Sequence, residues 1–369
     1  MAIWPFSRNK ANEAVKQAVE QKSYSLPELL ISANRAVKYN SWDIDTAIKL
    51  GYKANAAFFA CARIRAESSA EVPWRAMRKL ADGTFEHMPD SDLQRLIDNP
   101  NPDIDFSEMV EHMINSLDIA GNEYWTIVKG GLSGRKPIEI WPLDPRGMAI
   151  QGGEDTRLIK SYKYTTPGGG KSRPIDSDDI VHVKNANPES FLFGMPTVLA
   201  SGRGVDIYRE ARDAQKASFE NRGLHDFAVI LDTNTTGEQL DRIKKTYEER
   251  AAGAKNNRKP LFSTRDVKPL SAAPAEMDYI NTVESVVTEI CSVMGVPPSM
   301  IGYMQDATLA NFDTAKKVFW ENGMTPLLSR VSRQLTHQLA KQFGDEWAIQ
   351  PDLSNVKALQ ANYSESVTN

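Results

Sequence analysis

Apolar positions recur at helical spacing in the first half of the chain. Between 106 and 117 they form one face of a predicted helix, with Asp105 as its N-cap and Gly121 just after its end. A second helical pattern covers 53–70. Strand-like runs separated by Gly- and Pro-rich turns follow, at 122–129, 138–143, 161–166 and 179–185. We therefore expect 50–195 to form an α+β domain with an antiparallel sheet.

The pattern changes at Pro196. Residues 196–223 predict one long helix that is rich in charged residues and poor in apolar ones. Such a helix has too few apolar positions for the core of a single chain, so we expect it to be solvated or packed against other copies of itself.

Beyond this helix the chain alternates again. Two strands and a helix are expected in 224–273, followed by a second long helix over 274–295 and a loop over 296–311. Residues 312–354 predict a third long helix, kinked at Pro326, and a final strand. The ends, 1–49 and 355–369, are expected to form an N-terminal arm and a polar tail.

Composition limits the class of protein. The 369 residues are 41% hydrophobic and 25% charged, which suits two or three globular domains. The net charge of -4 argues against simple coating of DNA. Cys61 and Cys291 lie in apolar helical runs and are expected to be buried thiols, as in a reducing cytoplasm. Neither a secretory signal peptide nor a membrane span is predicted.

The motifs that resemble catalytic or phosphate-binding sites do not have the flanking residues that such sites require. The run 167–172 (PGGGKS) lacks the first glycine of a phosphate loop and lies between two strands, so it predicts a hairpin tip. The acidic run 176–179 predicts a charged turn before a strand, and the five histidines lack metal-site spacing. We therefore expect no enzyme activity, no cofactor and no metal.

Local charge gives one positive signal. Basic residues cluster between 242 and 268, with few acidic neighbours. The cluster is compatible with a solvated helix face and equally with a contact surface for DNA or for an acidic partner. Its main members are Arg242, Lys244, Lys245, Arg250, Lys255, Arg258 and Lys259.

Several short segments, in this order, make the chain resemble the portal protein family of tailed double-stranded DNA bacteriophages, in the branch typical of small siphophages. The resemblance rests on LIDNPNPDIDFSEMVEHMINSLDIAGNEYWTIV (96–128), IEIWPLDP (138–145), DDIVHVKN (178–185), FGMPTVLA (193–200), SFENRG (218–223) and ICSVMGVPPSMIG (290–302).

The resemblance implies a portal fold with named parts. Residues 50–195 would be the wing, 196–223 and 274–295 the stem, 224–273 the clip, and 296–311 the tunnel loop. The loop residues expected to line a channel are Pro298, Met300, Ile301, Tyr303, Met304, Gln305 and Asp306. The stem would present Arg203, Arg209, Arg212, Lys216 and Arg222, and the basic cluster would belong to the clip. Family members usually continue with a crown, which we expect to be absent or reduced here.

The resemblance also implies a function and partners. Family members form a ring, usually of twelve subunits, at one capsid vertex of the virion, and assemble in the host cytoplasm. Double-stranded DNA passes through without sequence recognition. The partners would be the terminase large subunit, a head–tail adaptor, the major capsid protein and scaffold, with no membrane. Two alternatives remain open: a nucleic-acid-processing enzyme, which would need carboxylates around Mg²⁺, and a monomeric scaffold or adaptor module.

Overall fold

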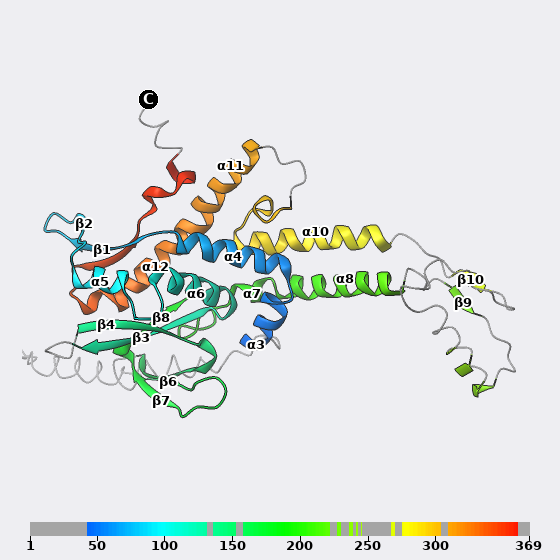
Figure 1. Cartoon of the computed structure of the whole chain (residues 1–369), viewed down its shortest axis with the longest axis horizontal. Coiled ribbons are helices and arrows are strands. Elements are labelled where there is room, and N and C mark those ends of the chain that lie inside the picture. The colour runs from blue at the N-terminus through cyan, green and yellow to red at the C-terminus, as the bar shows by residue number, and fades with distance from the viewer. Residues whose placement is uncertain are drawn as a thin grey trace, which may run out of the picture.

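An α+β body and a pair of long projecting helices make up the chain (Figure 1). The structure is a computed structural model. It describes residues 43–130, 136–152, 158–221, 227–229, 236–238, 241–242, 245, 267–269, 275–303 and 309–360. The α+β class expected from the sequence is confirmed.

The strands of the body form three antiparallel sheets of three strands each, in the orders β11-β1-β2, β4-β3-β8 and β5-β6-β7. The expected single sheet is divided because the turn at Pro145–Gly147 redirects the chain, so that β5 pairs with β6 and not with β4. The strands are β1 (Trp74–Lys79), β2 (Phe85–His87), β3 (Asn122–Gly130), β4 (Lys136–Leu143), β5 (Met148–Gly152), β6 (Ile159–Tyr164), β7 (Arg173–Asp176), β8 (Ile180–Lys184) and β11 (Trp347–Pro351).

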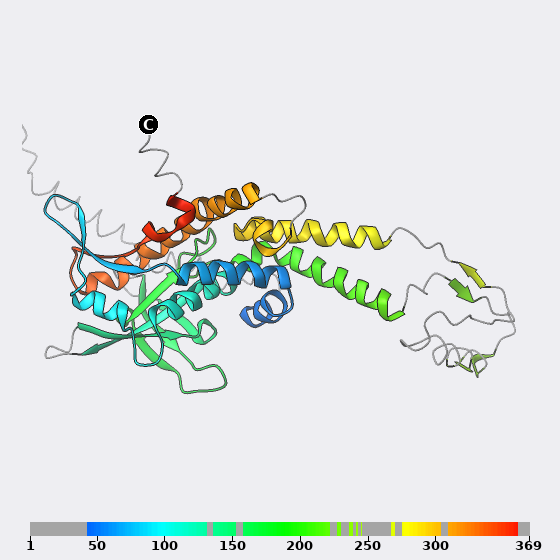
Figure 2. The same ribbon diagram turned by 45° about the horizontal axis from the view of Figure 1, so that its top comes forward.

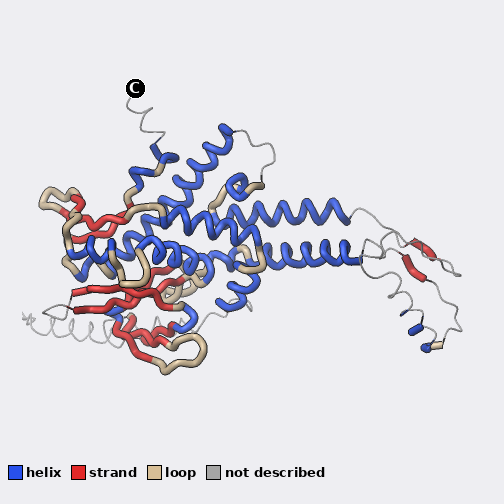
Figure 3. The backbone as a smooth tube through the Cα atoms, in the orientation of Figure 1, coloured by secondary structure: helices blue, strands red, loops and turns tan. Residues whose placement is uncertain are grey.

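Helices cover these sheets and continue into the projection (Figure 3). Those of the body are α3 (Ile44–Thr46), the π-helix η1 (Ala47–Tyr52), α4 (Ala56–Ala70), α5 (Asp92–Asp98), α6 (Phe106–Ile119), α11 (Leu309–Val318), the π-helix η6 (Phe319–Met324) and α12 (Thr325–Gln338). Short 3₁₀ turns lie at Ser177–Asp179, Pro298–Ile301 (η5), Ala340–Gln342 and Leu353–Asn355.

Helix α6 begins and ends where its sequence indicates. The Asp105 carboxylate accepts a hydrogen bond from the backbone N–H of Glu108 at 2.7 Å, which caps the first turn. Gly121 follows the helix with φ +73°, a left-handed conformation that glycine adopts without strain. A Cβ atom there would lie 2.5 Å from the carbonyl oxygen of Gly194, so this position also requires the absence of a side chain.

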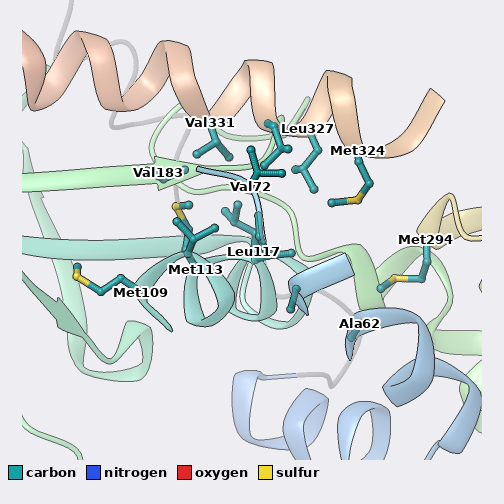
Figure 4. Packing of buried hydrophobic residues seen from close by; sticks show 14 of the residues in the cluster. Ala62, Val72, Met109, Met113, Leu117, Val183, Met294, Met324, Leu327 and Val331 are labelled. Atoms are coloured by element: carbon teal, nitrogen blue, oxygen red, sulfur yellow. The ribbon is translucent and has the colours of Figure 1, made fainter. Parts of the chain in front are cut away.

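The main core lies where α4 and α6 meet α12 and the β4-β3-β8 sheet (Figure 4). Met113 and Leu117 of α6 face Val331 and Leu327 of α12, with Val183 of β8 between the layers. All five side chains are at most 5% exposed. The apolar stripe of α6 therefore has its partners partly on an element more than 200 residues away in the sequence.

Three glutamines bond to the free edge of β8 and to the short turn before it, and we call them the glutamine clamp: Gln334 and Gln338 of α12, and Gln342 of the 3₁₀ turn that follows α12. Gln338 accepts from the N–H of His182 at 2.7 Å and donates to its carbonyl at 2.9 Å. Gln334 makes the same pair of bonds with Lys184, at 2.9 and 3.0 Å, and Gln342 donates to the Asp178 carbonyl at 3.0 Å. The side chains thus take the place of a further strand, and the edge of β8 is closed.

The projection consists of α8 (Gly202–Asn221) and α10 (Ala275–Met294), which lie side by side (Figure 2). The expected single helix over 196–223 is instead two, because Ser201 separates α8 from the short α7 (Thr197–Ala200).

The expectation that this charged helix lacks partners within one chain is also wrong. Val205, Tyr208 and Ala211 of α8 are buried, and they belong to the same apolar cluster as Val283, Val286 and Ile290 of α10. The sparse apolar residues of α8 lie on one face, and α10 supplies an apolar stripe that covers it.

The two cysteines are buried free thiols, as predicted, and they join the body to the projection. The Sγ atoms of Cys61 on α4 and Cys291 on α10 lie 3.7 Å apart. The hydrogen bond between the thiols and their burial raise the pKa of the Cys61 thiol. Among the helices of the described ranges, none is long and apolar enough to cross a membrane.

Candidate channel segment and stem surfaces

A buried ion pair holds the base of the two long helices to the body. The Arg65 guanidinium of α4 donates to both Asp118 carboxylate oxygens, at 3.0 and 3.1 Å, and to the carbonyl of Met294, the last residue of α10. Thr197 of α7 donates to the same carboxylate at 2.9 Å. The side chains of Arg65 and Asp118 are 11% and 1% exposed. One charge pair therefore fixes the end of α10 and the helix that leads into α8.

The surface of α8 carries balanced charge. Four basic residues and four acidic residues lie between Gly202 and Asn221: Arg203, Arg209, Arg212, Lys216, and Asp206, Glu210, Asp213, Glu220. Arg209 contacts Asp206 at 3.8 Å and Glu210 at 3.1 Å, and the Arg212 guanidinium lies 5.3 Å from the Tyr208 ring centre. Arg209 and Arg212 are thus engaged with their own helix, while Arg222 lies outside the described residues.

Helix α10 is acidic. Its four charged residues are Glu276, Asp278, Glu284 and Glu289, and it has no basic residue. Together α8 and α10 therefore carry a net negative charge, and this pair of helices repels a nucleic acid backbone overall.

The segment after α10 turns sharply back toward the body. Gly295 has φ +66° and Gly302 has φ +86°, and between them Pro298–Ile301 forms the 3₁₀ turn η5. Met300 and Ile301 pack partly against the core, whereas Tyr303 is 38% exposed. Of the residues expected to line a channel, Tyr303 is thus the most exposed of those described, and Met304, Gln305 and Asp306 lie outside the described residues.

The third long helix is interrupted before the expected proline kink. Residues Phe319–Met324 form a π-helical turn between α11 and α12, and Pro326 lies in the first turn of α12. Proline lacks the N–H that would bond one turn back, so the helical hydrogen bonding changes at this point. A Cβ atom on Gly323 would lie 3.0 Å from the Gly295 carbonyl oxygen, so the π turn packs closely on the end of α10.

Only part of the expected basic surface can be placed. Arg242 and Lys245 are exposed, whereas Lys244, Arg250, Lys255, Arg258 and Lys259 lie outside the described residues. Strands β9 (Phe227–Val229) and β10 (Val267–Pro269) pair antiparallel at the far end of the two long helices (Figure 1). Two short strands are therefore present within 224–273, as expected.

The motifs that resembled catalytic sites are turns, as expected. Residues 167–172 connect β6 to β7, with Gly168 and Gly169 at positive φ. Asp176 caps the short turn before β8, and Lys129 contacts Asp179 at 2.7 Å. Within the described residues, no group of three or more His, Cys, Asp or Glu side chains could hold a metal ion.

Sequence reasoning missed the polar groups that organise the junction between body and projection. Arg65 shares a helix face with Phe58, Cys61 and Ala62, all of which are buried. A charged residue on an apolar stripe is the signal that could have identified it, because a buried arginine requires a partner. Asp118, in the same way, occupies a buried position on α6.

Comparison with known proteins places this arrangement among viral and virus-like particles. The chain matches the phage portal protein family over residues 56–368. An uncharacterized protein of Rickettsia bellii is 26% identical over 317 residues, which span 84% of this chain and 80% of that protein.

Solved structures agree with this match. The chain is similar to a protein in the neck of an empty gene transfer agent particle computed with C6 symmetry, with TM-score 0.68, 27% identity and coverage of 91% and 92% of the two chains. For the neck of the native particle computed with C12 symmetry, the TM-score is 0.67, the identity 26% and the coverage 92% of both chains.

An HK97 family phage portal protein from Corynebacterium diphtheriae shares the fold, with TM-score 0.59, 14% identity and coverage of 84% and 94% of the two chains. The family match alone covers well over half of the sequence. The chain belongs to the phage portal protein family.

Proposed function

We propose that the chain is a subunit of a portal ring at one capsid vertex, where the ring forms the channel for packaging and ejection of double-stranded DNA. The observation that carries this proposal is the family match over residues 56–368, supported by similarity to neck proteins of particles computed with C6 and C12 symmetry. In this assignment the α+β body is the wing, α8 and α10 are the stem, and β9 and β10 belong to the clip.

The charge of the stem suits a conduit. DNA must slide through the ring, and each phosphate that a protein neutralises adds to the strength and salt dependence of binding. The balanced charge of α8, where Arg209 pairs with Asp206 and Glu210, and the acidic α10 would keep the stem from binding the duplex tightly.

The ring itself is a heterologous assembly, in which each subunit uses two different faces that meet around a closed circle. The terminase large subunit and a head–tail adaptor would dock at the clip, and the major capsid protein and scaffold would contact the wing. The ring would be part of the virion and would assemble in the host cytoplasm. The portal family is structural, and the described residues offer no metal cluster in favour of a nuclease.

The purified chain is expected to form closed rings with a central hole wide enough for duplex DNA, with twelve subunits as in the C12 particle neck. Mass photometry gives the subunit number, and negative-stain images show the hole. A chain that stays monomeric at every concentration, also in the presence of scaffold protein, would contradict the proposal.

Deleting residues 303–306 is expected to spare ring assembly and to impair the packaging or retention of DNA, because the exposed Tyr303 and the residues after it would narrow the channel. The measurement is the yield of DNA-filled particles from a complemented phage, with alanine at Lys357, an exposed residue, as the control. A normal yield of filled particles from the deletion would show that this segment does not act on the DNA.

A further inference from the structure

A cavity of about 430 Å³ lies where the wing meets the stem. It is bounded by the loop after β8, by α7, by the end of α10 and by the π turn that leads into α12. Its polar lining includes Arg65, Asn185, Thr197, Asn322 and Arg330, and none of its lining residues is acidic.

The charge inside this cavity is unbalanced. Arg65 is neutralised by Asp118, whose carboxylate also accepts from Thr197. Arg330 donates to the Asn185 side chain at 2.8 Å, and its buried Nε–H has no acceptor among the described residues. No carboxylate in the described part of the chain forms an ion pair with it.

Arg330 is therefore a half-buried cation that forms no ion pair within the described residues, although the Asp118 carboxylate attracts it at longer range. Burial, and secondarily the nearby Arg65 guanidinium, lower the pKa of Arg330. A desolvated charge of this kind is unfavourable unless a charge of opposite sign and further hydrogen bonds compensate it.

Asn185 holds the guanidinium ready for such a partner. The Asn185 amide donates to the carbonyls of Leu117 and Met195, at 2.7 and 3.1 Å, which fixes the oxygen that accepts from Arg330. One edge of the guanidinium is thus positioned by the chain itself, in a side chain that lines the cavity.

Ring symmetry points to the source of that acceptor. Rotation about the axis of a ring leaves the height of every residue unchanged, so a neighbouring copy presents its own α10 at the level of this cavity. Glu289 lies one helical turn, about 6 Å, before Val293, which lines the cavity. Glu289 is exposed, and no hydrogen bond or ion pair to it is formed within the described chain.

We propose that this cavity, which we call the Arg330 cavity, receives the Glu289 carboxylate of the neighbouring copy and so joins adjacent subunits at the wing–stem junction. The inference rests on the proposed ring. A free phosphate would meet the same guanidinium, and the experiment below distinguishes it from the carboxylate of a neighbouring copy.

The test compares ring assembly of Arg330→Met, Glu289→Gln and the double variant with wild type, by mass photometry over a range of protein concentrations. Arg333→Met is the matched control, since Arg333 is exposed on the same helix and does not line the cavity. Each single variant is expected to raise the protein concentration at which half of the subunits are assembled by about tenfold or more. The double variant should raise this concentration no further than the single variant with the larger effect, because both substitutions remove the same contact. The control should assemble like wild type.

Thermal unfolding of the unassembled subunit separates this role from a structural one. Glu289→Gln should leave the unfolding temperature unchanged, because Glu289 forms no hydrogen bond or ion pair within the described residues, whereas Arg330→Met also loses the bond to Asn185. If the wild type forms rings and a single variant forms them at the same protein concentration, the inference is overturned and the proposed function still holds. A wild-type chain that forms no rings contradicts the proposed function itself.

A third outcome would assign the cavity differently. Inorganic phosphate at fixed ionic strength could raise the unfolding temperature of the wild-type subunit and not that of Arg330→Met, with unchanged assembly of both variants. This result would identify a free oxyanion as the occupant and would overturn the inference.

Discussion

Replacing Asp118 with alanine should lower the free energy of unfolding by about 3–5 kcal/mol, the usual loss when one partner of a buried ion pair is removed. Arg65 would keep its charge in a site where its side chain is 11% exposed, with only the Met294 carbonyl as acceptor. The hydroxyl of Thr197 would lose its acceptor as well. Urea unfolding followed by circular dichroism measures the change.

The matched control for Asp118 is the exposed ion pair on α4. Arg63 and Glu67 lie 3.8 Å apart, and each side chain is 55% exposed, so Arg63→Ala should change stability by less than about 1 kcal/mol. Equal losses from Asp118→Ala and Arg63→Ala would show that the buried pair does not hold α7 and the end of α10 to the body.

Replacing Gln338 with leucine should lower the free energy of unfolding by about 2–5 kcal/mol. The substitution keeps the apolar stem but leaves the N–H and the carbonyl of the buried His182 without partners, at about 1–3 kcal/mol for each unsatisfied group. Amide hydrogen exchange at His182 should accelerate because its N–H loses its acceptor. Both effects are measured on the same purified protein.

His337→Leu serves as the control for this substitution. His337 is the neighbouring residue on α12 and is exposed, so a change within about 0.5 kcal/mol is expected. If Gln338→Leu left both stability and the exchange of His182 unchanged, the glutamine clamp would not close the edge of β8.

Local sequence signals predicted local structure well. Helix α6 has its cap, its apolar face and its terminal glycine within 17 residues, and each acts over a few residues only. The turn at 167–172 follows the same rule, since Gly168 and Gly169 adopt positive φ.

Long-range polar contacts could not be predicted in the same way. Arg330 and Asn185 are 145 residues apart, and the clamp joins Gln338 to a strand 156 residues earlier. Polar residues of α12 such as Arg330 and Gln338 have the spacing expected of a helix face exposed to water. The local sequence pattern cannot tell whether their hydrogen-bond partner is water or the edge of a strand. The apolar face of α8 was underestimated for a related reason, because its cover is a helix that begins at Ala275.

The glutamine clamp also sets the register between α12 and the wing. Four residues of a helix advance about 6.0 Å, while two residues of a strand advance about 6.6–6.8 Å, so the two repeats nearly match over two contacts. The helix can therefore adopt only discrete registers relative to the strand. Any intermediate position breaks the four hydrogen bonds of Gln334 and Gln338 at once. A displacement of α11 would therefore be taken up at the π turn around Gly323, because α12 is held in place by these bonds.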